Sequence, residues 1–142
     1  MKEFGAACGV AAAAGVRNGN DVVVSEEIAA STELAPGRAA ELIAAGAELI
    51  DVRRPYEFGG GHLPGARNIE MNELTAAADE LSRERAVIFC CRSGNRSSMA
   101  VAAFSEAGFD AHNIAGGIQA WVAEDRPLEP SDGTIIDPLP PA

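Results

Sequence analysis

Cysteine, histidine and basic residues are all scarce in this sequence. It has only three cysteines and two histidines, and no Cys-x-x-Cys pair. That count is too low for the disulfide framework of a small secreted domain, and a zinc site would have to be assembled from scattered ligands. Two of the cysteines, Cys90 and Cys91, are neighbours. Consecutive Cα atoms lie about 3.80 Å apart, which is closer than disulfide geometry favours. We therefore expect neither a disulfide scaffold nor a metal centre.

The shortage of basic residues excludes several classes of partner. Eleven Lys and Arg stand against 21 Asp and Glu, which gives a formal net charge of −10. Proteins that bind nucleic acid or anionic membrane surfaces need a basic face, so neither partner is expected. A field of this sign also disfavours anionic substrates. Any chemistry on an anion must therefore depend on local hydrogen-bond donors.

The 142 residues have the length of one domain with a tail at each end. Residues 1–31 form an expected N-terminal extension, partly disordered, with a short strand at 21–25. Its Ala/Gly-rich start is less basic and less bulky than a signal peptide and too short for a membrane span, so we expect a cytoplasmic protein. Residues 127–142 hold five of the eight prolines and cannot be helical. We expect this tail to lie over the surface or to stay mobile.

Between these ends, over residues 32–126, apolar runs alternate with helical patterns. Strands are predicted at 48–52, 86–90 and 110–114. Helices are predicted from Pro36 to 45, briefly over 55–61, from an Asn72 cap to 82, and over 97–107 and 118–125. This alternation predicts an α/β domain with a mainly parallel central sheet and helices on both faces.

The loop between the strand at 86–90 and the following helix carries the most chemical information. It reads CRSGNR from Cys91 to Arg96. Ligands of parallel α/β sheets gather at the carboxyl ends of strands, and backbone amides that lead into a helix form a cradle for anions. Gly94 permits a tight curl, while Arg92 and Arg96 add positive charge. A thiol placed there is expected to favour the nucleophilic thiolate form.

Three ordered motifs resemble the single-domain rhodanese family of sulfurtransferases. The first comprises LIDVR at 49–53, YEF at 56–58 and GHLPGARNI at 61–69; the second is CRSGNRS at 91–97; the third is AGGIQAW at 115–121. The resemblance covers roughly residues 32–125, and the order and spacing of the three motifs are far more specific than any one motif alone.

The resemblance implies a small rhodanese-like α/β fold and a persulfide mechanism. Cys91 would take a sulfur atom from a small anionic donor such as thiosulfate and pass it to a thiol, to cyanide or to a protein acceptor. No metal or organic cofactor is needed. The backbone amides of the rest of the loop would bind substrate and stabilise the persulfide. These substrate-binding residues are Arg92, Ser93, Gly94, Asn95, Arg96 and Ser97.

Two alternative functions remain open at this stage. Counted from Cys90, the loop gives Cys-x5-Arg-Ser, the pattern of cysteine-based phosphatases and some arsenate reductases. Adjacent strand residues face opposite sides of a sheet, so only one of the two cysteines is expected to face the cradle. The six-residue count from Cys91 favours a site of sulfur size. The second alternative is a non-catalytic persulfide carrier that delivers sulfur to a protein partner.

Supporting residues are expected at the end of the preceding strand. Asp51 could orient an arginine, accept loop amides or cap a helix. Arg53 and its neighbour Arg54 could add positive potential near the cleft or lie in solvent. Two positions depart from the two-domain thiosulfate enzymes of this family, since Glu57 stands where these tend to have an arginine and Ser93 where they often have a lysine. Both departures weaken the case for thiosulfate as the physiological donor.

Overall fold

The structure of this protein, a computed structural model, describes residues 32–137. The expected N-terminal extension, with its strand at 21–25, lies outside the described residues, as do residues 138–142.

A five-stranded parallel sheet forms the centre of the domain, with the strand order β1-β5-β4-β2-β3. Its strands are β1 (Glu33–Leu34), β2 (Glu48–Asp51), β3 (Arg67–Asn68), β4 (Val87–Cys90) and β5 (Ala111–Ile114). The three predicted strands are confirmed as β2, β4 and β5. All four residues of β4 are buried, as a strand covered on both faces requires. The carboxyl ends of β2 and β4 lie side by side, because Asp51 pairs with Cys90.

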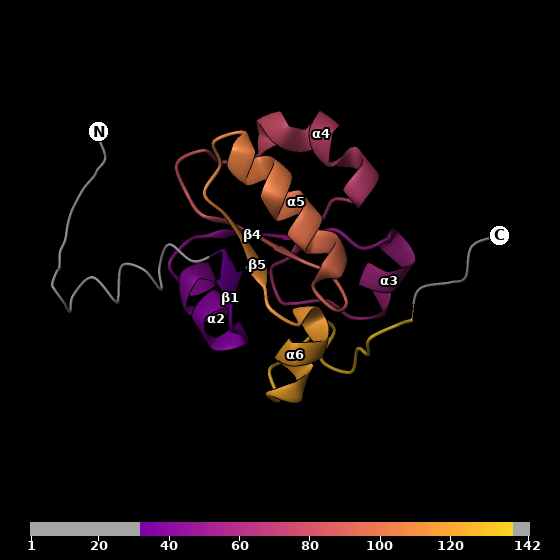
Figure 1. The fold of residues 1–142 in the computed structure, drawn as a ribbon. Coiled ribbons are helices and arrows are strands. Elements are labelled where there is room, and N and C mark those ends of the chain that lie inside the picture. The colour runs from indigo at the N-terminus through magenta and orange to yellow at the C-terminus, as the bar shows by residue number, and fades with distance from the viewer. Residues whose placement is uncertain (1–31, 138–142) are drawn as a thin grey trace, which may run out of the picture. The chain divides into compact units, whose positions relative to one another are not determined.

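Helices cover both faces of this sheet (Figure 1). One face carries α2 (Pro36–Ala44) and α6 (Gly117–Ala123), and the other carries α4 (Leu74–Ala77) and α5 (Asn95–Glu106). The short α3 (Pro55–Gly60) follows β2. Each face has its own apolar cluster, one built around Phe89 and Phe104 and the other around Ile88 and Trp121. The expected α/β architecture is confirmed.

The segment predicted as one helix over 72–82 is broken into three turns. A 3-10 turn (Met71–Glu73) precedes α4, and a second one (Ala78–Glu80) follows it. Asn72 lies inside the first turn, and no side chain caps α4, so the predicted cap is wrong. Apart from Leu74 and Leu81, the segment buries little of its surface, and an alanine-rich stretch with two anchors tolerates this irregular winding.

The proline-rich tail runs along the domain as far as Asp137. Leu128 is buried in the apolar cluster beneath α2 and α6, and Ile135 packs against the same cluster. Glu129 forms an isolated antiparallel bridge with His62. None of the helices within residues 32–137 is long and apolar enough to cross a bilayer.

Candidate active site

The loop after β4 turns sharply before α5 begins. Gly94 caps the helix with a φ of 98°, in the left-handed region that glycine adopts without strain. A side chain at this position would also crowd the main chain, since its Cβ would lie 3.3 Å from the Gly116 nitrogen and 3.4 Å from the Ile114 oxygen. The helix starts at Asn95, two residues earlier than predicted, because Gly94 supplies the turn. Loop and helix therefore leave the sheet in a tight curl.

The curl surrounds the sulfur of Cys91 with hydrogen-bond donors. The backbone amides of Gly94 and Ser97 lie 3.1 and 3.4 Å from Sγ, and the Ser97 hydroxyl lies 3.3 Å away. Cys91 is 1% exposed, so these donors act where little water competes with them. Donors converging on one sulfur stabilise negative charge on that atom.

The start of α6 holds this loop in place from the other side. The amide of Ile118 donates to the Cys91 oxygen at 2.8 Å, and that of Gln119 donates to the Arg92 oxygen at 3.1 Å. Gly117, at φ 62°, makes this approach possible. A Cβ there would lie 2.5 Å from the Cys91 oxygen and 2.6 Å from the Arg92 oxygen. The AGGIQAW motif thus contributes the main-chain support of the loop.

A buried polar chain fixes the Ser97 hydroxyl. Its Oγ lies 2.5 Å from Oδ1 of Asn113, and the Asn113 amide donates to the Gly94 oxygen and to the Glu33 carboxylate, each at 3.2 Å. Because both acceptors attract the amide NH₂, Oδ1 of Asn113 must face Ser97. Because the hydroxyl has one hydrogen, Oδ1 of Asn113 fixes the position of Ser97 and competes with Sγ of Cys91 for that hydrogen.

Cys90 points to the opposite face of the sheet. It is fully buried in the apolar cluster beneath α2 and α6, whereas Cys91 belongs to the cluster beneath α5. Burial raises the pKa of the Cys90 thiol well above its ordinary value, and the charge of Asp51 adds to this effect. This environment keeps Cys90 a neutral thiol at physiological pH.

Arg96 is held by a buried carboxylate rather than left open to an anion. Its two terminal nitrogens donate to the two oxygens of Glu57 at 2.9 and 3.0 Å, and the Arg54 amide donates to Glu57 at 3.1 Å. Burial acts to raise the pKa of Glu57, but the hydrogen bonds from Arg96 and Arg54 and the charge of Arg96 outweigh it. The pKa of Glu57 therefore lies below its ordinary value. The hydrogen bond from Arg96 to Glu57 is also the main cause that raises the pKa of Arg96.

Arg92 is paired with the tail. Its Nη2 donates to Oδ1 of Asp137 at 2.6 Å, and its Nε is buried with no hydrogen-bond partner in the described part of the chain. Both loop arginines therefore face carboxylates of their own chain, and the positive potential expected from them is compensated.

Asp51 and Arg53 form a buried pair at the end of β2. Both are 0% exposed, and Asp51 accepts hydrogen bonds from the Arg53 amide and from its guanidinium, the latter at 2.8–3.1 Å. Arg53 also donates to the Gly61 oxygen at 2.8 Å. Of the alternatives for Asp51, the structure shows the orientation of an arginine, and the solvent-exposed alternative for Arg53 is wrong. The pair ties β2 to the segment after α3.

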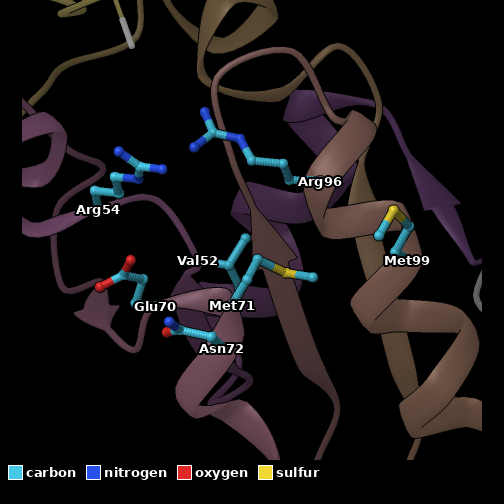
Figure 2. A pocket seen from close by; sticks show the side chains of 7 residues that line it. All are labelled: Val52, Arg54, Glu70, Met71, Asn72, Arg96 and Met99. Carbon is cyan, nitrogen blue, oxygen red and sulfur yellow. The ribbon is translucent and has the colours of Figure 1, made fainter. Parts of the chain in front are cut away.

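A pocket of about 470 Å³ opens beside the first turns of α5. Figure 2 shows the side chains of Arg54 and Arg96 pointing toward one another from opposite sides, with Val52 and Met71 below Arg96. Met99 of α5 also lines it and is 64% exposed. The pocket therefore combines apolar side chains with two arginines, and Glu70 and Asn72 also line it.

The sequence-predicted loop residues divide into two groups. Cys91, Gly94 and Ser97 come together at the sulfur. Arg92, Ser93, Asn95 and Arg96 make no hydrogen bond to it among the described residues; Ser93 and Asn95 are exposed, and the two arginines are paired elsewhere. No cluster of three or more metal-ligating side chains occurs within residues 32–137.

Sequence reasoning missed the contacts of three carboxylates and one amide: Glu33, Glu57, Asp137 and Asn113. Glu57 had a local signal, since an acid three residues after a helix N-cap commonly bonds back to the cap amide. Asn113, a polar residue inside a predicted buried strand, had a weaker one. No signal marked Asp137, which reaches Arg92 across 45 residues of chain.

Comparisons with known proteins agree with this geometry. Residues 35–124 match the Rhodanese-like domain family model. The chain is 31% identical over 100 residues to thiosulfate sulfurtransferase GlpE of Pseudomonas aeruginosa, covering 70% of this chain and 87% of that protein. It is 34% identical over 86 residues to a sulfurtransferase of Allochromatium vinosum, covering 60% and 80% of the two chains.

Solved structures show the same fold. A rhodanese-related protein from Thermoplasma volcanium is 32% identical with a TM-score of 0.64, covering 68% of this chain and 95% of its own. The BH2092 protein from Bacillus halodurans is 26% identical with a TM-score of 0.67, covering 84% and 92%. By its motifs, its sheet and the family match over residues 35–124, this chain belongs to the rhodanese-like domain family.

Proposed function

We propose that this protein is a sulfurtransferase that carries a sulfane sulfur atom as a persulfide on Cys91. One observation supports this above all others: two backbone amides and a hydroxyl converge on Sγ of Cys91 at 3.1–3.4 Å. A site of this kind stabilises a thiolate before reaction and a persulfide anion after it. The sulfurtransferase names of similar proteins point to the same chemistry.

The reaction balances without a cofactor. The Cys91 thiolate attacks the outer sulfur of a donor such as thiosulfate, and a new S–S bond forms. The bond between that sulfur and the sulfite group breaks, and sulfite leaves with the electron pair. A thiophilic acceptor, cyanide or a thiolate, then attacks the terminal sulfur of the persulfide and regenerates the Cys91 thiolate.

The site favours Cys91 over Cys90 as the reacting group. The phosphatase or arsenate-reductase alternative requires Cys90 as nucleophile, but Cys90 is fully buried on the other face of the sheet and its pKa is raised. A buried neutral thiol is a poor nucleophile. Since a persulfide cycle depends on a reduced thiol, we place the activity in the cytoplasm.

Intact-mass measurement after incubation with thiosulfate tests this proposal. The wild type and Cys90→Ser should each gain one sulfur atom, and Cys91→Ser should gain none. An adduct that is lost in Cys90→Ser and kept in Cys91→Ser would show that Cys90 carries the sulfur and would overturn the proposal.

Turnover separates an enzyme from a dedicated carrier. With thiosulfate and cyanide in excess, an enzyme forms many equivalents of thiocyanate per protein. A carrier loads once and releases its sulfur only to a specific protein acceptor. We expect multiple turnovers, because attack by the acceptor regenerates the Cys91 thiolate. A single equivalent of thiocyanate would favour the carrier.

A further inference from the structure

The two loop arginines are neutralised in different ways. Glu57, which pairs with Arg96, is 0% exposed and uses both carboxylate oxygens. Asp137, which pairs with Arg92, is 81% exposed and uses one oxygen. The first pair is a fixed part of the domain. The second lies at the surface, where an arriving anion can exchange with the carboxylate.

The segment that carries Asp137 is anchored along its length. Trp121 donates from Nε1 to the Pro127 oxygen at 2.8 Å, which fixes the start of the segment. His62 and Glu129 then exchange two backbone hydrogen bonds, at 2.7 and 3.0 Å. We call residues 127–137 the C-terminal strap.

The end of the strap packs directly on two glycines, Gly60 and Gly61, so closely that neither position has room for a side chain. The Thr134 amide donates to the Gly60 oxygen at 2.9 Å, and Ile136 covers the position where Gly60 would carry a Cβ. At Gly61, a Cβ would lie 2.6 Å from the Thr134 oxygen. Asp137 follows directly after these contacts. Its carboxylate is therefore delivered to Arg92 by a folded segment of the domain.

We propose that Asp137 is a specificity-determining residue, an internal carboxylate that competes with anionic sulfur donors for Arg92. The inference rests on the function proposed above. With Arg96 engaged by Glu57, Arg92 is the loop arginine whose carboxylate partner lies in solvent. A donor with two negative charges must displace Asp137 or be repelled by it. A donor with a lower charge is affected less, so the strap lowers the preference for dianionic donors.

Two donors that differ in charge isolate this effect. Thiosulfate is a dianion, and methanethiosulfonate presents a comparable S–S bond with a single negative charge. Exposed ion pairs contribute modestly, so Asp137→Asn should lower KM for thiosulfate about two- to fivefold. It should change KM for methanethiosulfonate less, and the difference should vanish in high salt, which screens exposed charges.

Three variants serve as controls. Asp132→Asn removes the same charge from an exposed position of the same strap and should leave both KM values unchanged. Asp137→Glu keeps the carboxylate and should keep the wild-type ratio of the two KM values. In an Arg92→Ala background, Asp137→Asn should no longer change KM for thiosulfate, because the guanidinium for which Asp137 and the donor compete is absent.

The outcomes distinguish this inference from the proposed function. If the wild type gains a sulfur atom on Cys91 but Asp137→Asn leaves the thiosulfate KM unchanged, the role of Asp137 is refuted and the sulfurtransferase stands. An equal change of KM for both donors, or the same change with Asp132→Asn, refutes it as well. If no variant gains sulfur on Cys91, both proposals fall together.

Discussion

Removing the Ser97 hydroxyl tests how much the side-chain donor beside the Cys91 sulfur contributes. A hydrogen bond to a charged group is worth about 1.5–3 kcal/mol, equivalent to about 10- to 150-fold in rate. The hydroxyl has one hydrogen and two neighbours, Sγ of Cys91 at 3.3 Å and Oδ1 of Asn113 at 2.5 Å. Because the closer neighbour competes for that hydrogen, the lower end applies. We expect Ser97→Ala to slow persulfide formation about tenfold.

The same substitution should also destabilise the domain. It leaves Oδ1 of the buried Asn113 without its hydroxyl partner, at a cost of about 1–3 kcal/mol in the free energy of unfolding. Urea unfolding measures this cost, and time-resolved intact mass with thiosulfate measures the loading rate. Ser98→Ala is the matched control, since that exposed hydroxyl contacts only the Asn95 oxygen in the hydrogen bonds of the described chain. Loading by Ser97→Ala at the wild-type rate would refute the role of the hydroxyl.

Three further predictions concern the supports of the loop. Glu57→Gln places an amide NH₂ against Arg96 and should lower the free energy of unfolding by about 1–2 kcal/mol. This is a low value for charged hydrogen bonds, because Arg96 is one-third exposed. Urea unfolding midpoints measure the change. The pKa of Glu57 is lowered on folding, so its carboxylate stabilises the fold above its unfolded pKa, and this stabilisation is lost as pH falls through the folded pKa. The fall of the urea midpoint at acid pH should therefore be less steep in Glu57→Gln than in the wild type. An equally steep fall in both proteins would contradict the assignment. Gly117→Ala should abolish sulfur loading, because its Cβ would clash with the oxygens of Cys91 and Arg92. Gly65→Ala is the control and should retain loading, since Gly65 also has a positive φ but has open space around it. Equal loading by both variants would show that the contact at Gly117 is not needed.

The strand at 86–90 could be predicted because it is a continuous apolar run, whereas β5 carries His112 and Asn113 between two apolar residues. The strands at 48–52 and 110–114 follow from shorter strand patterns that alternate with helical stretches, and the same alternation predicts their parallel pairing. The two-residue strands β1 and β3 could not be found in this way, since two residues show no periodicity. The irregular winding of the segment after β3 could not be predicted for a different reason. Its alanines favour a continuous helix, but tertiary packing does not complete that helix.

The candidate site was predictable in its main chain and less so in its charges. The position of Cys91 at a strand end and the turn at Gly94 follow from local sequence. The neutralisation of the arginines does not, because Arg96 meets Glu57 across 39 residues and Arg92 meets Asp137 across 45. Such pairs depend on the completed fold, and no local pattern encodes them.

In the proposed mechanism, these pairings change what stabilises negative charge on the Cys91 sulfur. With both arginines compensated, and with a formal net charge of −10 on the chain, little of the stabilisation can come from net positive charge. It must come from dipoles close to Sγ, two of which are backbone amides that no side-chain substitution removes. The proposed mechanism therefore depends more on the glycines that shape the main chain than on the charges of the two loop arginines.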